Sequence, residues 1–508
     1  MRSACDVAVV GAGFGGLAAA LRLAELGLRV VCLEALAYPG GCASTFTRKG
    51  ARFESGATLF SGFGQGELFE QWVQRHHMDV RFERIDPPVE LRAPGFEMPI
   101  DADRERFVTR MAEACGEAGP RVTAFFAEQA RVAETLWALF RDPTLLPPLD
   151  LGSLLRHAVR APAYLPLLRL VGRPLRDVLV RHGIESVVPL RTFLDAVCQI
   201  TVQCSADEAE APFAMGAMDY YFRGTGHVHG GIGRLAEGMA GAVRDLGGEV
   251  ILPCKVHAIA ADAGGYRLDT RHGELRARAV VSNLLPEATA RLLGASAGSD
   301  DVLAPLQRKV EDGWGAAMLY RVLEAGAVPG RKHAHHVELV ASPSEAFVEG
   351  NHVFCSLSGD DEARVPTKAG ARTLTVSTHV PMRKLLAMND AEQGAYVASV
   401  QQRMRETIAR LAPELDAGVA LEMTGSPRTF ARFTGRPQGY VGGIPRRAGL
   451  GNYRVLTPTR LRPAFYLCGD TCFPGQSTLA VALSGVKVAE RLADELGHHA
   501  GEARLSAR

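Results

Sequence analysis

The pattern of apolar and polar positions is clearest at the start of the chain. Val7 to Val10 form an uninterrupted apolar run, which is typical of a strand buried on both faces of a parallel sheet. A glycine-rich break follows, and the alanine- and leucine-rich segment from Leu17 to Leu26 then predicts a helix that Gly27 closes. Arg29 to Leu33 repeats the buried-strand pattern. The sequence therefore begins with a predicted βαβ half-unit.

The pattern changes twice further along the chain. Apolar positions recur with helical spacing from about residue 67 to residue 223, with interruptions at Pro147, Pro148, Pro162 and Pro166. Short alternating runs then predict strands at 249–252, 255–261, 266–270 and 275–281. Residues 300–425 mix predicted strands with a long helix near 391–411. A last strand at 464–467 runs into a helix that begins at about Ser477.

Both ends of the chain have the character of a dinucleotide-binding domain, and most of the sequence separates them. We therefore predict an α/β protein in which a Rossmann-type domain is discontinuous and an α+β substrate domain is inserted into it. A chain of 508 residues is long enough for two domains. The predicted cofactor domain comprises residues 1–66, 224–298 and 426–508, and the substrate domain comprises residues 67–223 and 299–425.

Three glycines lie between the first predicted strand and the first predicted helix. Gly11, Gly13 and Gly16 form a G-x-G-x-x-G motif, in which the first glycine permits a tight turn and the second admits a pyrophosphate. The third allows close packing of helix and strand, and the helix N-terminus attracts negative charge. Glu34 ends the second strand, where a carboxylate accepts hydrogen bonds from ribose hydroxyls. The spacing predicts a dinucleotide site.

Two further segments favour FAD over NAD. Gly40 and Gly41 allow a second stretch of backbone to approach the phosphates. Near the other end, Gly469 and Asp470 follow a predicted strand, so that Asp470 can hold ribityl hydroxyls and the next helix can point its N-terminus at the flavin pyrimidine. We predict that FAD is the cofactor. The remaining candidate cofactor-binding residues are Val256, Gly475, Gln476 and Ser477.

These motifs resemble those of the FAD-dependent carotenoid desaturase and isomerase family, which includes phytoene desaturases, carotenoid isomerase and retinol saturase. The most similar stretch is the sequence from Gly469 to Gln476, followed by the stretch from Ala480 to Val486. The resemblance extends from residue 7 to about residue 490. Its supporting stretches are Gly56–Gly62, His229–Gly233, Ala279–Asn283 and Gly435–Tyr440.

The resemblance implies a fold of the amine oxidase and phytoene desaturase superfamily, with an apolar polyene as substrate. It leaves desaturation, isomerisation and saturation open, because in each of them a C–C unit lies over the flavin N5 atom. A flavin amine oxidase acting on another substrate is one alternative. A second is a non-enzymatic escort protein for prenylated GTPases, which shares the fold without the complete phosphate motif.

The chain departs from these relatives at His227 and His229, where they usually carry a Tyr-Pro or similar pair. If this loop lies over the flavin, His229 is a candidate catalytic residue that exchanges a proton with the substrate near neutral pH. The alternative is a pair of loop histidines that are hydrogen-bonded or face solvent. We expect no metal site, because no third ligand lies near the pair.

Residues 151–182 combine six arginines with many leucines. A basic, leucine-rich helical segment can lie in a membrane interface, or it can pack on the protein with its arginines outward, and the sequence leaves both open. The net charge of +1 gives no reason to expect binding to nucleic acid. The first strand begins near Asp6, which leaves no room for a signal or transit peptide. No run of about 18 uninterrupted apolar residues predicts a spanning helix. We therefore expect a cytoplasmic protein that can attach peripherally to membranes; the oligomeric state stays open.

Overall fold

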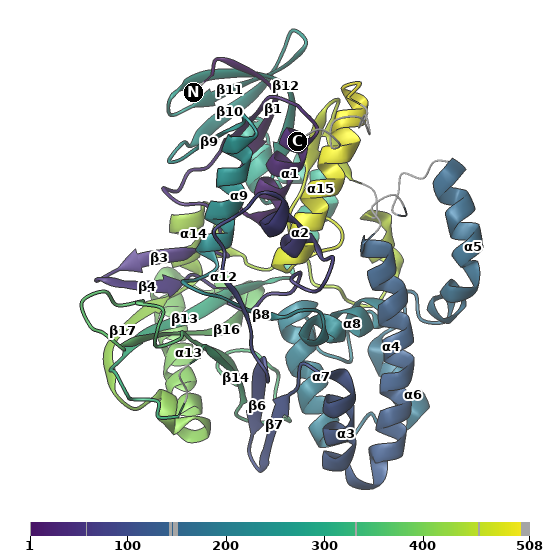
Figure 1. Ribbon diagram of the computed structural model, residues 1–508, viewed down its shortest axis with the longest axis vertical. Coiled ribbons are helices and arrows are strands. Elements are labelled where there is room, and N and C mark those ends of the chain that lie inside the picture. The colour runs from purple at the N-terminus through teal and green to yellow at the C-terminus, as the bar shows by residue number, and fades with distance from the viewer. Residues whose placement is uncertain are drawn as a thin grey trace. The chain divides into compact units, whose positions relative to one another are not determined.

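The computed structural model describes residues 2–56, 58–141, 145, 151–330, 333–455 and 458–498. The chain divides into two compact units, which are described separately below (Figure 1). Unit 1 comprises residues 1–41, 235–307 and 458–508, and unit 2 comprises residues 42–234 and 308–457. Pro147, Pro148 and the end of the predicted cofactor domain, 499–508, lie outside the described residues, as does Ala57.

Unit 1 is built on an eight-stranded sheet. Its strands are β1 (Ala4–Val10), β2 (Val30–Leu33), β9 (Glu249–Ile251), β10 (Val256–Asp262), β11 (Gly265–Thr270), β12 (Gly273–Ser282), β18 (Thr459–Arg462) and β19 (Phe465–Leu467). The order is β10-β11-β12-β1-β2-β9, with β19 also paired with β12 and β18 with β19. β1 is parallel to both β2 and β12. All of β2 and all but the first residue of β1 are buried, which explains their uninterrupted apolar sequences.

Helices cover this sheet. They are α1 (Phe14–Glu25), most of α9 (Gly233–Asp245), α10 (Pro286–Leu292) and α15 (Thr478–Glu495). α1 packs against β1, β2 and α15, and Gly485 permits the close approach of the two helices. A Cβ atom at Gly485 would lie 2.1 Å from the carbonyl oxygen of Gly15. The predicted βαβ half-unit is confirmed, and so are the predicted strands that became β10, β11 and β12.

Unit 2 contains a seven-stranded sheet in the order β17-β13-β16-β15-β14-β6-β7. Its strands are β6 (Val89–Ala93), β7 (Phe96–Ile100), β13 (Trp314–Leu323), β14 (His335–Val340), β15 (His352–Leu357), β16 (Arg372–Pro381) and β17 (Val419–Gly425). Only the β6–β14 pairing is parallel. The long helix α13 (Asp390–Leu411) packs against β13, β14 and β15. β6 and β7 form a hairpin within a region that the sequence predicted as mainly helical.

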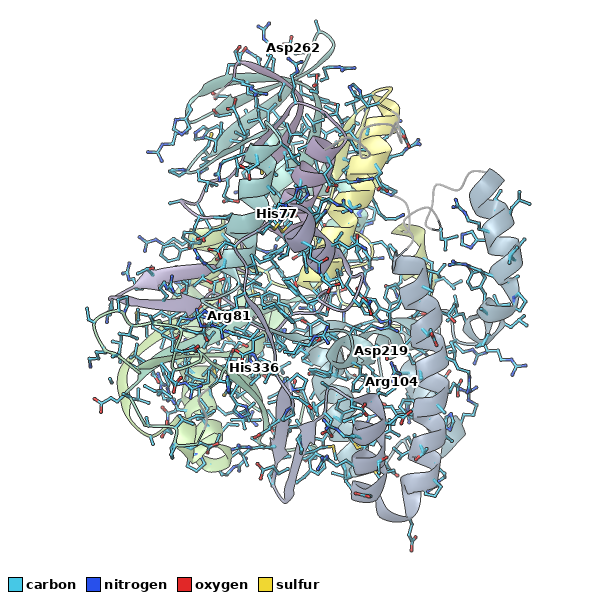
Figure 2. The ribbon with its side chains drawn as sticks, in the orientation of Figure 1. His77, Arg81, Arg104, Asp219, Asp262 and His336 are labelled. Carbon is cyan, nitrogen blue, oxygen red and sulfur yellow. The ribbon has the colours of Figure 1, made fainter. Side chains whose placement is uncertain are left out.

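The helical part of unit 2 has its own apolar core, which includes Phe107, Phe126 and Phe193. Its main helices are α3 (Arg104–Ala114), α4 (Gly119–Arg141), α5 (Leu151–Leu168), α6 (Leu175–His182), α7 (Val188–Thr201) and α8 (Ala211–Met218). Buried Asp219 forms ion pairs with Arg104 and Arg223, and Figure 2 shows Arg104 beside Asp219 among these helices. The remaining elements of unit 2 are β3 (Thr45–Arg48), β4 (Ala51–Glu54), α2 (Leu68–Arg75), β5 (Phe82–Arg84), β8 (Gly226–Val228), α12 (Met382–Leu386) and α14 (Pro427–Thr434).

The boundaries of the two units differ from the predicted domain limits. Residues 42–66, 224–234 and 426–457, which the prediction gave to the cofactor domain, pack with unit 2 instead. The reason is visible in the pairing: β8 is hydrogen-bonded to β5, and Glu54 at the end of β4 forms an ion pair with Arg364. Hydrogen bonds that the sequence pattern does not reveal therefore fix these segments.

Candidate functional site

The first glycine turn of unit 1 joins β1 to α1. Gly11 has a φ of +96°, a backbone conformation that glycine adopts without strain. A Cβ atom at Gly16 would lie 1.9 Å from the carbonyl oxygen of Gly11, so this position accepts no side chain. Gly13 is the N-cap residue of α1, and no side chain caps that helix end. The N–H groups of the first turn therefore point toward a place where an anion can accept their hydrogen bonds.

Glu34 follows β2, and its carboxylate is hydrogen-bonded to the backbone of this turn. Its Oε2 accepts a hydrogen bond from the N–H of Ala12 at 2.8 Å, and its Oε1 accepts one from the N–H of Leu36 at 2.9 Å. Burial raises the pKa of Glu34 above its usual value, and the two backbone hydrogen bonds oppose that shift. The carboxylate therefore holds the glycine turn in place, a contact that the sequence analysis did not foresee. Binding of ribose hydroxyls by Glu34 stays a prediction.

The second glycine pair contacts the first turn. Gly40 has a φ of +108° and donates its N–H to the carbonyl oxygen of Ala12 at 2.8 Å. Gly41 has a φ of +62°, and a Cβ atom there would lie 3.4 Å from the Cα atom of Gly13. The structure thus brings together two glycine motifs, as expected if both approach the same phosphates.

The third predicted segment lies between β19 and α15. Gly469 and Gly475 have φ values of +102° and +132°, so both depend on the conformational freedom of glycine. Ser477, the N-cap residue of α15, has a φ of +96°, which is strained for a residue with a side chain. Its hydroxyl accepts a hydrogen bond from the N–H of Ala480 at 3.1 Å. Asp470 and Gln476 are half-buried in the same segment.

The two ends of the chain meet at this point. A Cβ atom at Gly15 would lie 3.1 Å from the Cα atom of Gly469 and 3.1 Å from the carbonyl oxygen of Val481. β12 lies between β1 and β19 and pairs with both in parallel. Segments more than 400 residues apart in the sequence therefore form one surface, and this surface lies wholly within unit 1.

Asn283 lies among these glycine segments. The sequence analysis did not predict it as a site residue. Its Oδ1 atom would lie 2.6 Å from a Cβ atom at Gly469 and 2.7 Å from one at Gly15. Its Nδ2 atom would lie 2.8 Å from a Cβ atom at Gly13. Its backbone N–H donates to the carbonyl oxygen of Val10 at 2.9 Å, which fixes it at the end of the sheet. The Asn283 side chain therefore fills the space that three glycines leave open.

Two hydroxyl groups provide a test of whether the surface fits FAD. Thr471 and Thr478 are 1% and 6% exposed, and neither Oγ1 atom has a hydrogen-bond partner within the described residues. A buried hydroxyl without a partner is unfavourable by about 1–3 kcal/mol, so these atoms indicate a ligand rich in acceptors. FAD offers phosphate, ribityl and pyrimidine acceptors. The side-chain-free glycine turns and the two hydroxyls fit this group.

Val256 is the one candidate cofactor-binding residue that belongs to none of the segments described so far. It is the first residue of β10, is 6% exposed and pairs with Thr270 of β11. The N–H of Cys254, two residues earlier, donates to the carbonyl oxygen of Glu34, which brings this segment to the end of β2. Contact between Val256 and the cofactor stays a prediction.

The predicted catalytic residue, His229, lies in unit 2. Its Nε2 atom is 3.4 Å from Oδ2 of Asp361, and its side chain is 24% exposed. His227, on the same loop, is more deeply buried at 2% and its Nε2 atom lies 3.0 Å from Oε1 of Glu362. Of the two histidines, His227 is the one that a buried carboxylate orients.

Comparison with known proteins agrees with this geometry. Residues 14–303, more than half of the chain, match the family described as flavin-containing amine oxidoreductase. Prolycopene isomerase of Arabidopsis thaliana is 25% identical over 518 residues, covering 97% of this chain and 83% of the isomerase. Hydroxyneurosporene desaturase of Rhodobacter capsulatus is 30% identical over 197 residues, covering 36% of this chain and 37% of the desaturase.

The solved structure of cyclohexylamine oxidase from Brevibacterium oxydans shares the fold, with a TM-score of 0.59 and 16% identity over 97% of this chain and 99% of that one. The predicted fold class, the FAD cofactor and the resemblance to carotenoid desaturases and isomerases are confirmed by these similarities. The protein is therefore an FAD-dependent enzyme, and the chain belongs to the flavin-containing amine oxidoreductase family.

Proposed function

We propose that this enzyme acts on a long, apolar, carotenoid-like polyene, in which it either desaturates C–C bonds or isomerises C=C bonds. The observation that carries the proposal is the similarity to prolycopene isomerase over 97% of the chain, because it includes both remote segments of the flavin site. Hydroxyneurosporene desaturase, the second relative, is named for a different reaction on a polyene. The proposal therefore names the substrate class and the two reactions together.

Each element of unit 1 has a defined task in this proposal. Gly11, Gly13 and Gly16 form the tight turn whose backbone N–H groups receive the pyrophosphate at the N-terminus of α1. Glu34 holds the turn and accepts hydrogen bonds from the ribose. Gly40, Gly41 and Val256 line the nucleotide, and the segment comprising Gly469, Asp470, Gly475, Gln476 and Ser477 holds the flavin end. When bound, FAD supplies hydride or electron exchange at its N5 atom.

Proton exchange is assigned to the loop that carries His227 and His229. His229 is the proposed proton carrier, because its imidazole is partly exposed and stands beside the carboxylate of Asp361. Replacement of His229 by Gln is expected to lower turnover while FAD retention stays unchanged.

A peripheral attachment to the membrane completes the proposal, because a polyene dissolves in lipid. Five large aliphatic side chains of α5 are exposed by at least half: Leu154, Leu155, Val159, Leu165 and Leu168. Arginines interleave with them within the basic segment 151–182. A helix of this composition binds at an anionic lipid surface. None of the helices in the described residues is long and apolar enough to cross a membrane.

The deciding experiment supplies a polyene in liposomes to the purified, FAD-loaded enzyme, with oxidised and with reduced flavin in parallel. Product mass and absorbance separate the two reactions: desaturation removes two hydrogens, whereas isomerisation shifts the spectrum at constant mass. Amines are tested in the same preparation by release of hydrogen peroxide. Turnover of an amine, with no reaction of any polyene, would replace the proposal by an amine oxidase function.

A further inference from the structure

A second group of buried polar side chains lies in unit 2 and takes no part in the flavin site. This group, called the His227 cluster below, consists of Glu54, His227, His336, Glu362 and Arg364, and each member is at most 5% exposed. They come from β4, β8, β14 and the segment after β15, so only the fold assembles them. Figure 2 shows His336 among the strands of unit 2.

Arg364 joins the two carboxylates of the cluster. Its Nη2 atom lies 3.0 Å from Oε1 of Glu54 and 2.8 Å from Oε2 of Glu362. Glu362 also accepts the N–H of Gly230 at 2.8 Å, and its Oε1 lies 3.0 Å from Nε2 of His227. Burial raises the pKa of Glu362, but His227 and Arg364 outweigh it and hold the pKa well below its usual value. Glu362 is therefore a carboxylate, and His227 donates its Nε2 proton to it.

The second ring nitrogen of His227 is unpaired. Its Nδ1 atom is buried and has no hydrogen-bond partner within the described residues. An unpaired polar atom in such a place is unfavourable, so it marks a position where a further polar group can bind.

The ring of His336 lies beside the ring of His227. The ring centroids of His227 and His336 are 6.1 Å apart, and Phe354 stacks on His336 at 5.9 Å. The Nδ1 atom of His336 lies 2.9 Å from Oγ of Ser356, whereas its Nε2 atom has no partner in the described part of the chain. Burial, reinforced by His227, lowers the pKa of His336 well below its usual value, so this ring is neutral.

We propose that His227 and His336 form a receptor for one neutral oxygen function, a hydroxyl or a carbonyl, of the polyene substrate. This inference rests on the proposed function. A hydroxyl donates one hydrogen bond and accepts another, so it can complete the hydrogen bonding of Nδ1 of His227 and of Nε2 of His336. A pure hydrocarbon leaves both nitrogens without a hydrogen bond. A carboxylate would bring a second buried negative charge close to the carboxylate of Glu362, so the substrate is a polyene alcohol or carbonyl compound.

The test compares polyenes that differ by one oxygen function. Neurosporene is paired with hydroxyneurosporene, and β-carotene with β-cryptoxanthin. Binding to the FAD-loaded enzyme is followed by quenching of Trp72, Trp137 and Trp314, all of which lie in unit 2. One additional neutral hydrogen bond predicts that at least one hydroxylated polyene has a Kd lower than its partner by about fivefold.

His336→Phe keeps the ring on Phe354, removes both nitrogens and is expected to reduce the Kd ratio to about one. His335→Phe, on the opposite face of the same strand, is the control and is expected to keep the ratio. Equal Kd values in both wild-type pairs would mean that water fills the receptor, which overturns the inference and leaves the proposed function standing. A ratio that survives in His336→Phe also overturns it. Failure to bind or convert any polyene removes the proposed function and this inference with it.

Discussion

Unit 1 and unit 2 each contain a buried polar site, but the two sites are built in opposite ways. In unit 1 the surface is mainly backbone, and Gly13, Gly15 and Gly469 matter because they carry no side chain. In unit 2 the His227 cluster consists of polar side chains that ion pairs and hydrogen bonds join to one another. Added atoms should therefore be the most damaging change in unit 1, and removal of a charge the most damaging change in unit 2.

The largest effect is expected from Arg364→Met in unit 2. The substitution keeps an unbranched side chain but leaves the carboxylates of Glu54 and Glu362 buried without their shared cation. Breaking a buried ion pair in this way destabilises a protein by about 3–5 kcal/mol. The measurement is urea unfolding followed by tryptophan fluorescence, which reports on unit 2 alone. Arg403→Met, which removes a half-exposed pair with Glu345, is the control and should lower the free energy of unfolding by at most about 1 kcal/mol. Equal losses would contradict the role given to the cluster.

Gly16→Ala is the corresponding test in unit 1. The new Cβ atom would lie 1.9 Å from a backbone oxygen that cannot rotate away, so the glycine turn must shift. Overpacking of this kind destabilises by about 1–3 kcal/mol, and we expect the purified variant to lose its flavin absorbance. Gly241→Ala, in α9, places its Cβ atom in open space and should keep the flavin. A yellow Gly16→Ala protein would show that the turn does not hold the cofactor.

Asn283→Leu tests whether FAD binding depends on the amide group of Asn283 as well as on the volume of this side chain. Leucine has a similar volume, but it removes the amide that lies against Gly13, Gly15 and Gly469. Loss of the amide, whose Oδ1 accepts a hydrogen bond from Sγ of Cys468 at 3.7 Å, costs about 1 kcal/mol and should raise the Kd for FAD about fivefold. Flavin fluorescence on dilution measures this value. Asn389→Ala removes the N-cap of α13 in unit 2 and should leave the Kd for FAD unchanged, although it weakens that unit. An unchanged Kd in Asn283→Leu would assign Asn283 to packing alone.

The same contrast explains how much the sequence could predict. The glycine turns of unit 1 are local motifs, because each turn is formed by residues that are close together in the chain. Their positions could therefore be predicted from the sequence. Asn283 is different: the contacts that single it out come from three separate segments, and an asparagine after a strand has the ordinary appearance of a turn residue. The pairing of His227 with Glu362 spans 135 positions, so no spacing in the sequence could indicate it.

The domain limits, like the pairing of His227 with Glu362, depend on contacts between residues that are distant in the sequence. The apolar periodicity found β10, β11 and β12 but gave the β3–β4 hairpin to the cofactor domain. Glu54 at the end of that hairpin is bound by Arg364, and this ion pair belongs to unit 2. The β6–β7 hairpin was missed because its strands are short and β7 contains Pro99, which weakens the pattern of a strand. Long-range side-chain bonds decided where these segments fold.

The smallest expected effect is a difference in how the two units respond to acid. Folding lowers the pKa of Glu362: burial opposes the shift, but His227 and Arg364 outweigh it. Its stabilising contribution is therefore complete above the usual value of 4.5 and is lost as the pH falls from there through the lowered value. Folding raises the pKa of Glu34, mainly through burial, so its contribution is complete below 4.5 and is lost as the pH rises through the raised value.

In the FAD-free protein, acidification below pH 4.5 should thus lower the urea midpoint reported by tryptophan, and Glu362→Gln should flatten that dependence. Hydrogen exchange of peptides from α1 should show no such loss through Glu34, and Glu34→Gln should remove the opposite trend above pH 4.5. Parallel acid dependence in both units would mean that neither carboxylate governs its own region.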